Sequence, residues 1–260
     1  MTADSSKNIF LRLAQYQCYQ SVARRLEIAK RIVENKVNNQ MVLIRNFRWT
    51  AEEYDRKNDL NEIKKMLDTL REKETSNEIM GVEGICSAIY FRAYGHMFRC
   101  KTIFPGRNRR PRTDPIKVIL SLTYTFLTKE IASALEAESF ETYLGFLHGI
   151  RYGRKSLALD LVEEFRQPAA DRLVLRLFNK QMISEYDFDI EGDIVRLKEE
   201  SFKKFCVEYE KWMTQPVSGL DPRSFRDILK EQISQLKKAI RERTIYTPYG
   251  WGKENVSGLL

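Results

Sequence analysis

The chain has 260 residues, enough for one large domain or two small ones, and its 43% hydrophobic and 11% aromatic content excludes a disordered or fibrous protein. The 44 Lys and Arg outnumber the 36 Asp and Glu, and the net charge of +8 favours a polyanionic partner without settling which one. No signal-peptide pattern and no apolar run long enough to span a bilayer is apparent. The four cysteines lack paired short spacing, which indicates a reducing cytosol with buried or idle thiols. They are Cys18, Cys86, Cys100 and Cys206.

The first half of the chain shows helical periodicity. Apolar residues recur at steps of three and four from Val22 to Ile44, which predicts one buried helical face, and the basic residues there, Lys36 among them, fall on the opposite face. Residues 51–78 are highly charged and predict an exposed helical hairpin. A buried helix follows from Met80 to Met97, with Glu83 near its start between two glycines. The basic residues of the first helix are Arg24, Arg25, Lys30, Arg31, Lys36 and Arg45.

The second half begins with a basic, proline-containing segment, 101–115, which predicts a flexible loop. Asp114 and Pro115 then read as the cap and first residue of a long apolar helix over 116–135. A helix over 157–166 follows, and Pro168 is expected to open another that reaches about Ser184. The chain then predicts a hairpin over 188–197, helices over 199–213 and 222–243, and a loose tail from Tyr246. The expected fold class is therefore mainly α, a single multi-helix domain over 1–260 with one small β-hairpin.

Four polar residues form the candidate site. His148, one of two histidines, lies in a Gly- and Arg-rich turn twelve residues before Asp160, and Glu163 is three residues further on. Residues that are three positions apart lie on the same side of a helix, so both carboxylates are expected to face whatever His148 faces. Glu83 lies in an apolar segment, where a carboxylate needs a partner. A divalent cation held by these residues would supply one, but a salt bridge, a helix cap and a structural histidine remain alternatives.

Several motifs follow one another along the chain: Gly81-Val82-Glu83-Gly84, Ala88-Ile89-Tyr90-Phe91, Arg110-Pro111, Asp114-Pro115, Leu120-Ser121, Leu144-Gly145-Phe146-Leu147-His148 and Leu157 to Arg166. Their order and content resemble the CRISPR-associated protein one family, the integrase of spacer acquisition. The resemblance runs from about Asn8 to Trp251. Two residues depart from the family's usual pattern: Glu163, where many relatives have aspartate, and Lys117, where relatives commonly have asparagine.

The resemblance implies a helical catalytic domain without the family's N-terminal β-rich domain. It places the ligands of Mg²⁺ or Mn²⁺ on Glu83, His148 and Glu163, with Asp160 as a further catalytic residue of the same motif. The implied reaction is attack by the 3′-hydroxyl of a DNA fragment on a phosphodiester of the CRISPR repeat. Implied partners are double-stranded DNA, the small ferredoxin-like second CRISPR adaptation protein and a second copy of the chain, in a prokaryotic cytoplasm and without a membrane.

Basic residues beside these motifs are candidates for phosphate contacts, with one tyrosine available to stack on a base. A non-catalytic DNA-binding or scaffolding helical protein, in which the polar residues form a metal-free buried network, is the alternative function. An RNA-binding module is a third possibility, although no aromatic motif of the usual RNA folds is present. The candidate DNA-binding residues are Arg109, Arg110, Arg112, Tyr152, Arg154 and Lys155.

Overall fold

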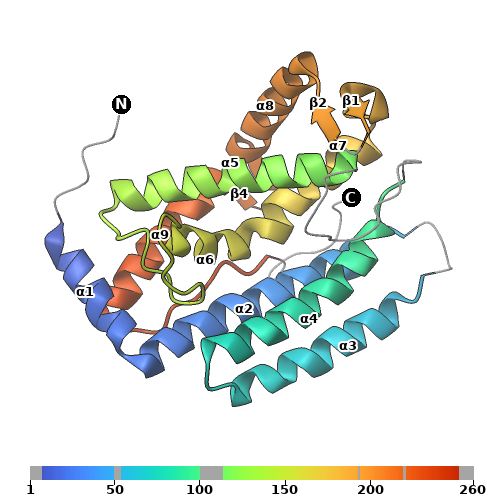
Figure 1. Cartoon of the computed structure of the whole chain (residues 1–260). Coiled ribbons are helices and arrows are strands. Elements are labelled where there is room, and N and C mark those ends of the chain that lie inside the picture. The colour runs from blue at the N-terminus through green and yellow to red at the C-terminus, as the bar shows by residue number, and fades with distance from the viewer. Residues whose placement is uncertain (1–7, 50–53, 100–113, 193, 219–220, 252–260) are drawn as a thin grey trace.

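A computed structural model describes residues 8–49, 54–99, 114–192, 194–218 and 221–251, which form α-helices and two short antiparallel strand pairs (Figure 1). The fold is mainly α with a small hairpin, as predicted, and the pair β3–β4 is an addition. The helices are α1 (Ile9–Gln20), α2 (Val22–Asn46), α3 (Arg56–Asp68), α4 (Ser76–Gly95), α5 (Pro115–Ala137), α6 (Ser156–Phe165), α7 (Arg172–Asn179), α8 (Glu199–Thr214) and α9 (Phe225–Glu242). Shorter helical turns are η1 (Thr69–Glu72), η2 (Arg166–Asp171) and η3 (Glu185–Asp187). The strands are β1 (Phe188–Glu191), β2 (Ile194–Leu197), β3 (Pro216–Ser218) and β4 (Asp221–Ser224).

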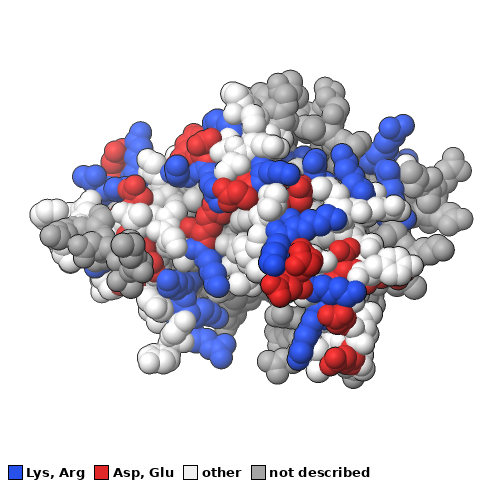
Figure 2. Space-filling view, turned by 90° about the horizontal axis from the view of Figure 1, so that it is seen from above, with Lys and Arg blue, Asp and Glu red and all other residues white. Residues whose placement is uncertain are grey.

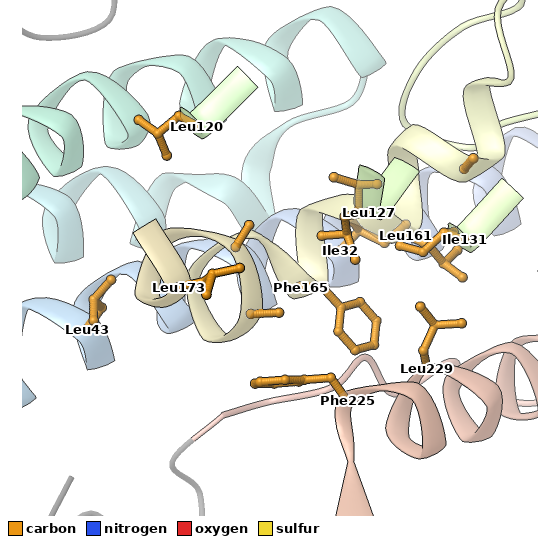
Figure 3. Close-up of a cluster of buried hydrophobic side chains, with 14 of the residues drawn as sticks. Ile32, Leu43, Leu120, Leu127, Ile131, Leu161, Phe165, Leu173, Phe225 and Leu229 are labelled. Carbon is orange, nitrogen blue, oxygen red and sulfur yellow. The ribbon is translucent and has the colours of Figure 1, made fainter. Parts of the chain in front are cut away.

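Helix α6 lies at the centre of the fold. It packs against α2 on one side and α5 on the other. Helices α3 and α4 pack against α2 on the side away from α6 (Figure 1). Leu161 and Phe165 of α6 point into a cluster that α2, α5 and α9 complete (Figure 3). Burying each such side chain stabilises the fold by about 1.5–3 kcal/mol. Helix α6, which carries Asp160 and Glu163, is therefore held in place by the core itself.

The segment after α6 differs from the prediction that Pro168 opens a new helix. The chain stays helical from α6 through the π-helical turn η2 into α7, which ends at Asn179 rather than near Ser184. Proline lacks an N–H and clashes with the carbonyl four residues earlier in an α-helix, so the wider π turn accommodates it without ending the helix. Helix α6, the turn η2 and helix α7 therefore form one continuous helical segment through the core.

Helix α5 begins as predicted. The Asp114 side chain accepts a hydrogen bond from the backbone N–H of Ile116 (2.8 Å), and Pro115 occupies the first turn. By length and composition alone, α5 also passes as a membrane-spanning helix, which the sequence analysis did not anticipate. It packs against α6, α7 and α9, and a core helix meets the same criterion.

The Asp114 cap provides a test of this fold. Asp114→Ala is expected to lower the free energy of unfolding by about 1 kcal/mol, because the N–H of Ile116 loses its acceptor. Asp114→Asn keeps the acceptor oxygen and should stay close to wild type. Urea denaturation followed by circular dichroism measures both, and equal losses in the two variants would contradict the capping role.

Two predicted segments have different outcomes. Residues 100–113 lie outside the described part of the chain, so the loop predicted over 101–115 can be compared only at its end, where Pro115 begins α5. The expected loose tail from Tyr246 is wrong for the residues up to Trp251. Tyr246 is buried, and its hydroxyl donates to Glu164 (2.6 Å). The chain after α9 is therefore anchored on the core.

Candidate functional site

Asp160 and His148 form the first half of the site. Asp160, in the second turn of α6, is fully buried and accepts hydrogen bonds from the backbone N–H groups of Phe146, Leu147 and His148. Its Oδ1 also lies 2.8 Å from Nδ1 of the His148 ring. Both carboxylate oxygens are thus used to shape the turn before α6. Asp160 acts as a positioning residue that fixes the backbone and the ring of His148.

The turn itself requires a glycine. A Cβ at Gly145 would lie 2.8 Å from the carbonyl oxygen of His148 and equally close to the backbone carbon of Ser156. Contacts that short are not tolerated between a side chain and a backbone, so only glycine lets the turn close against the start of α6. The Gly145-Phe146-Leu147-His148 motif therefore has a direct structural cause.

Glu83, Glu163 and Lys36 form the second half. Glu83 of α4 and Glu163 of α6 each make an ion pair with the ammonium of Lys36 on α2. The Lys36 side chain is only 3% exposed, so the expectation that it lies on the solvent-facing side of its helix is wrong. Ser87, one turn after Glu83, donates to Glu83 Oε1 (2.7 Å). Three helices thus bring two carboxylates to one buried positive charge.

Arg166 adds a second positive charge. Its Nε lies 3.0 Å from Glu163 Oε2, and its guanidinium stacks on the ring of Tyr124, 4.4 Å from the centroid. The Tyr124 hydroxyl donates to Asp171, a buried carboxyl at the end of the π turn that also accepts from Tyr90 (2.6 Å). The first and last residues of the π turn, Arg166 and Asp171, therefore both contact Tyr124, and this contact helps to hold Arg166 beside Glu163.

The electrostatic surroundings differ sharply between neighbouring glutamates. Burial would raise the pKa of Glu163, but Arg166 and Lys36 lower it to about 2. Burial raises the pKa of Glu164 to about 7, although its bonds with Tyr246 and Tyr249 oppose that shift. Glu163 is thus held as a carboxylate at neutral pH, and the difference comes from the cations that face only one of the two side chains.

The pKa values of Glu83 and His148 are both shifted in the direction that favours the charged form of the side chain. Burial works against the charge on Glu83, yet Lys36 lowers its pKa below the usual value. Burial would lower the pKa of His148, but the hydrogen bond and charge of Asp160 raise it. His148 also lowers the pKa of Glu163, and Glu163 raises that of His148. The charges of these two side chains, one before α6 and one on it, therefore stabilise each other.

Residues 244–251 contact two of the helices that carry the site residues, α2 and α6. Glu164 accepts hydrogen bonds from the hydroxyl of Tyr246 and from the N–H of Tyr249 (3.1 Å). The amide side chain of Asn39 on α2 donates to the carbonyl of Glu164 (3.1 Å), and its oxygen accepts from the N–H of Trp251 (3.0 Å). This segment ties α2 to α6 beside Lys36 and Glu163, which the sequence analysis missed.

The donor types suit a hard divalent cation. Two carboxylates face one positive charge, and the bond between Asp160 and Nδ1 leaves Nε2 of His148 available. A carboxylate on the second ring nitrogen is the usual support of a metal-binding histidine. Among the described residues, no three His, Cys, Asp or Glu side chains are grouped closely enough to hold an ion as they stand. Lys36 separates the two glutamates, and the ligand assignment stays a prediction.

The structure describes three of the six candidate DNA-contacting residues. Tyr152 is fully exposed at the tip of its turn. Arg154 folds back onto the carbonyl of Gly149, and Lys155 pairs with Glu136 (2.6 Å). Basic and acidic side chains are interspersed on the face in Figure 2. Contacts with DNA are untested for all six candidates, three of which lie outside the described residues: Arg109, Arg110 and Arg112.

The fold and site together define a helical protein in which a histidine–aspartate pair and two lysine-paired glutamates involve the central helix α6. A model of the family described as CRISPR associated protein Cas1 matches residues 1–211. The chain is 36% identical over 253 residues to CRISPR-associated endonuclease Cas1 3 of Thermus thermophilus, covering 96% of this chain and 74% of that protein. The chain belongs to the Cas1 family.

Solved structures share the fold. A casposase bound to integration product matches with a TM-score of 0.84 and 23% identity over 98% of this chain and 71% of that one. A partial Cas6-RT-Cas1–Cas2 complex matches with a TM-score of 0.85 and 24% identity over 96% of this chain and 74% of that one. The chain spans 41 to 65% of the length of several other curated relatives.

Proposed function

We propose that the chain carries the active site of a spacer integrase and endonuclease, which acts on DNA phosphodiester bonds with Mg²⁺ or Mn²⁺. Family membership and a relative named as an endonuclease support the activity, and the fold shared with a casposase bound to integration product is consistent with it. The observation that carries the proposal is the pairing of His148 with Asp160 beside two glutamates that converge on one positive charge.

In this proposal Glu83, Glu163 and Nε2 of His148 hold the cation, and Asp160 keeps the imidazole in the required tautomer. A bound divalent cation supplies charge stabilisation at the reacting phosphate. Glu163, held as a carboxylate by its two cationic neighbours, needs no proton transfer before it binds metal. Arg166, stacked on Tyr124, keeps that carboxylate in place.

The proposed reaction is a transesterification. The oxygen of the 3′-hydroxyl of a DNA fragment forms a bond to phosphorus in the CRISPR repeat, and the bond from phosphorus to the 3′-oxygen of the repeat strand breaks. The leaving oxygen takes up a proton, and the attacking hydroxyl releases one, so no covalent bond to the protein forms. Water in place of the 3′-hydroxyl gives hydrolysis.

The proposed partners are double-stranded DNA, a second copy of the chain and the small ferredoxin-like second adaptation protein, in a prokaryotic cytoplasm. A solved complex that contains Cas1 and Cas2 shares this fold. Tyr152, Arg154 and Lys155 are the described candidates for DNA contact. Because most of their interactions with DNA would be to phosphates, we expect the affinity to fall steeply with salt.

The function is tested with His148→Ala. Strand transfer from a labelled fragment with a free 3′-hydroxyl into a repeat-containing duplex, in Mn²⁺, is expected to fall by more than about a hundredfold, because a ligand is removed at the reacting phosphate. His96→Ala is the matched control, since His96 is the other histidine, stacks on Tyr54 at 4.3 Å and lies outside the site. DNA affinity should stay near wild type in both.

Full strand transfer by His148→Ala at the same Mn²⁺ concentration would refute the proposal. A second readout is the imidazole NMR signals, of which the His148 signal should respond to Mn²⁺ and the His96 signal should not. One observation favours the alternative, a non-catalytic DNA-binding or scaffolding protein: Lys36 and Arg166 already balance the two glutamates. Metal-independent DNA binding with no turnover in the wild type would support that alternative.

A further inference from the structure

Lys36 is placed for a specific role in this site. It lies four residues after Ile32 and three after Val33, both fully buried, so the helix turns its side chain into the protein. Its ammonium pairs with Glu83 from α4 and Glu163 from α6. Burying a lysine without acidic partners is strongly unfavourable, so these two ion pairs offset the cost of burying the Lys36 side chain.

The charges balance without any added ion. Glu83 and Glu163 contribute two negative charges, and Lys36 and Arg166 contribute two positive ones. A divalent cation between the glutamates would leave an excess of two positive charges if both basic side chains stayed in contact. Charges this close, at low exposure, repel strongly. Metal binding and the Lys36 contacts therefore oppose one another.

Of the two basic side chains, Lys36 is the one free to leave. Arg166 is held over the ring of Tyr124 and pairs with Glu163. Lys36 has a flexible four-carbon stem, and its ammonium bridges both carboxylates. The glutamates also keep other partners, because Ser87 holds Glu83 and Arg166 holds Glu163. Withdrawal of Lys36 would thus leave the carboxylates positioned.

We propose that Lys36 is an internal counter-cation: it takes the place between Glu83 and Glu163 in the metal-free protein, stabilises the fold there, and is displaced when a divalent cation binds. It is a positioning residue that sets metal affinity. This inference rests on the proposed function for the presence of a cation. It adds that the metal-free state is stabilised by this chain's own lysine, at a cost in affinity for the metal.

The test uses Lys36→Met, which keeps the length of the side chain and removes its charge. Lys30→Met is the matched control, since Lys30 lies on the same helix and donates to the carbonyl of Arg71 (2.8 Å) away from the site. Without metal, Lys36→Met is expected to lower the thermal midpoint by about 5–10 °C, because the buried Glu163 and the half-buried Glu83 both lose a partner. Mn²⁺ binding, measured by the EPR signal of the free ion, should tighten by about tenfold or more.

Mn²⁺ should also restore most of the lost midpoint in Lys36→Met, since the ion replaces the missing charge. Lys30→Met should behave as wild type in both measurements. If Lys36→Met does not fold without metal, the Lys36→Met/Glu83→Gln double variant provides the metal-free test. It should be more stable than Lys36→Met, because it removes a carboxylate that lacks compensation. A double variant that is less stable would overturn the counter-cation role.

The affinity measurement separates this inference from the proposed function. If wild type and Lys36→Met bind Mn²⁺ equally well, the competition is refuted and the metal site stands. Weaker binding by Lys36→Met refutes the competition as well, and makes Lys36 a support for the ligands. If neither protein binds Mn²⁺ at millimolar concentration, both proposals fail. Binding by Lys36→Met alone would confirm the competition directly.

Discussion

Asp160→Ala is expected to lower the free energy of unfolding by about 3–5 kcal/mol, the largest effect of any single change at this site. The carboxylate is fully buried and accepts three backbone N–H groups as well as a contact from the His148 ring. Alanine leaves those donors buried without acceptors. Urea denaturation at pH 7 in metal-free buffer measures the loss.

Asp189→Ala is the control, because Asp189 is exposed and reaches Lys198 only at 4.0 Å. That change should stay within about 0.5 kcal/mol of wild type. Asp160→Asn should fall between the two, since one oxygen still accepts from the turn while the amide NH₂ faces donors. A loss below about 1 kcal/mol for Asp160→Ala would show that the turn does not depend on this carboxylate.

The sequence predicted elements well where the signal is local. The cap at Asp114, the first turn at Pro115 and the hairpin over 188–197 each depend on residues within a few positions of one another, and all three are confirmed. Helix α6 also forms as expected and carries both Asp160 and Glu163, but only Asp160 contacts His148, whereas the Glu163 carboxylate pairs with Lys36 and Arg166. The metal these residues would share stays a prediction.

Lys36 shows what the sequence could not provide. Among apolar residues at steps of three and four, a lysine reads as part of the solvated face, since lysine is rarely buried. The signal that was present is its spacing from Ile32 and Leu43, both fully buried on the same side of α2. What makes that burial possible is two glutamates from distant helices. No local pattern reports a partner 47 or 127 positions away.

The predictions of a loose tail from Tyr246 and of a new helix from Pro168 were wrong for the same reason. Tyr246 follows a helix end and precedes Pro248, which reads as an irregular terminus, but its hydroxyl is fixed by Glu164. A proline such as Pro168 ends or kinks an α-helix in most local sequence contexts. Here η2 is flanked by α6 and α7 in a core that buries both, so tertiary packing outweighs the local preference.

Glu163→Gln is expected to remove about 3 kcal/mol of stability at pH 7 in the metal-free protein. The pKa of this carboxyl is about 2 in the fold against an ordinary 4.5, and each unit of difference corresponds to about 1.4 kcal/mol. Glutamine keeps the shape of the side chain but leaves Lys36 and Arg166 without this negative charge. Glu199→Gln, at a side chain that is 82% exposed, is the matched control and should change little.

The pH dependence of that difference identifies its cause. A carboxyl whose pKa is lowered by folding contributes stability that is fully present above the unfolded pKa and is lost as pH falls towards the folded one. The advantage of wild type over Glu163→Gln should therefore be constant from pH 7 to about 5.5 and shrink to less than half by about pH 3. Free energies of unfolding measured across this range test it. Two curves that stay parallel down to pH 3 would mean that the loss comes from altered packing, and not from the charge that Lys36 and Arg166 stabilise.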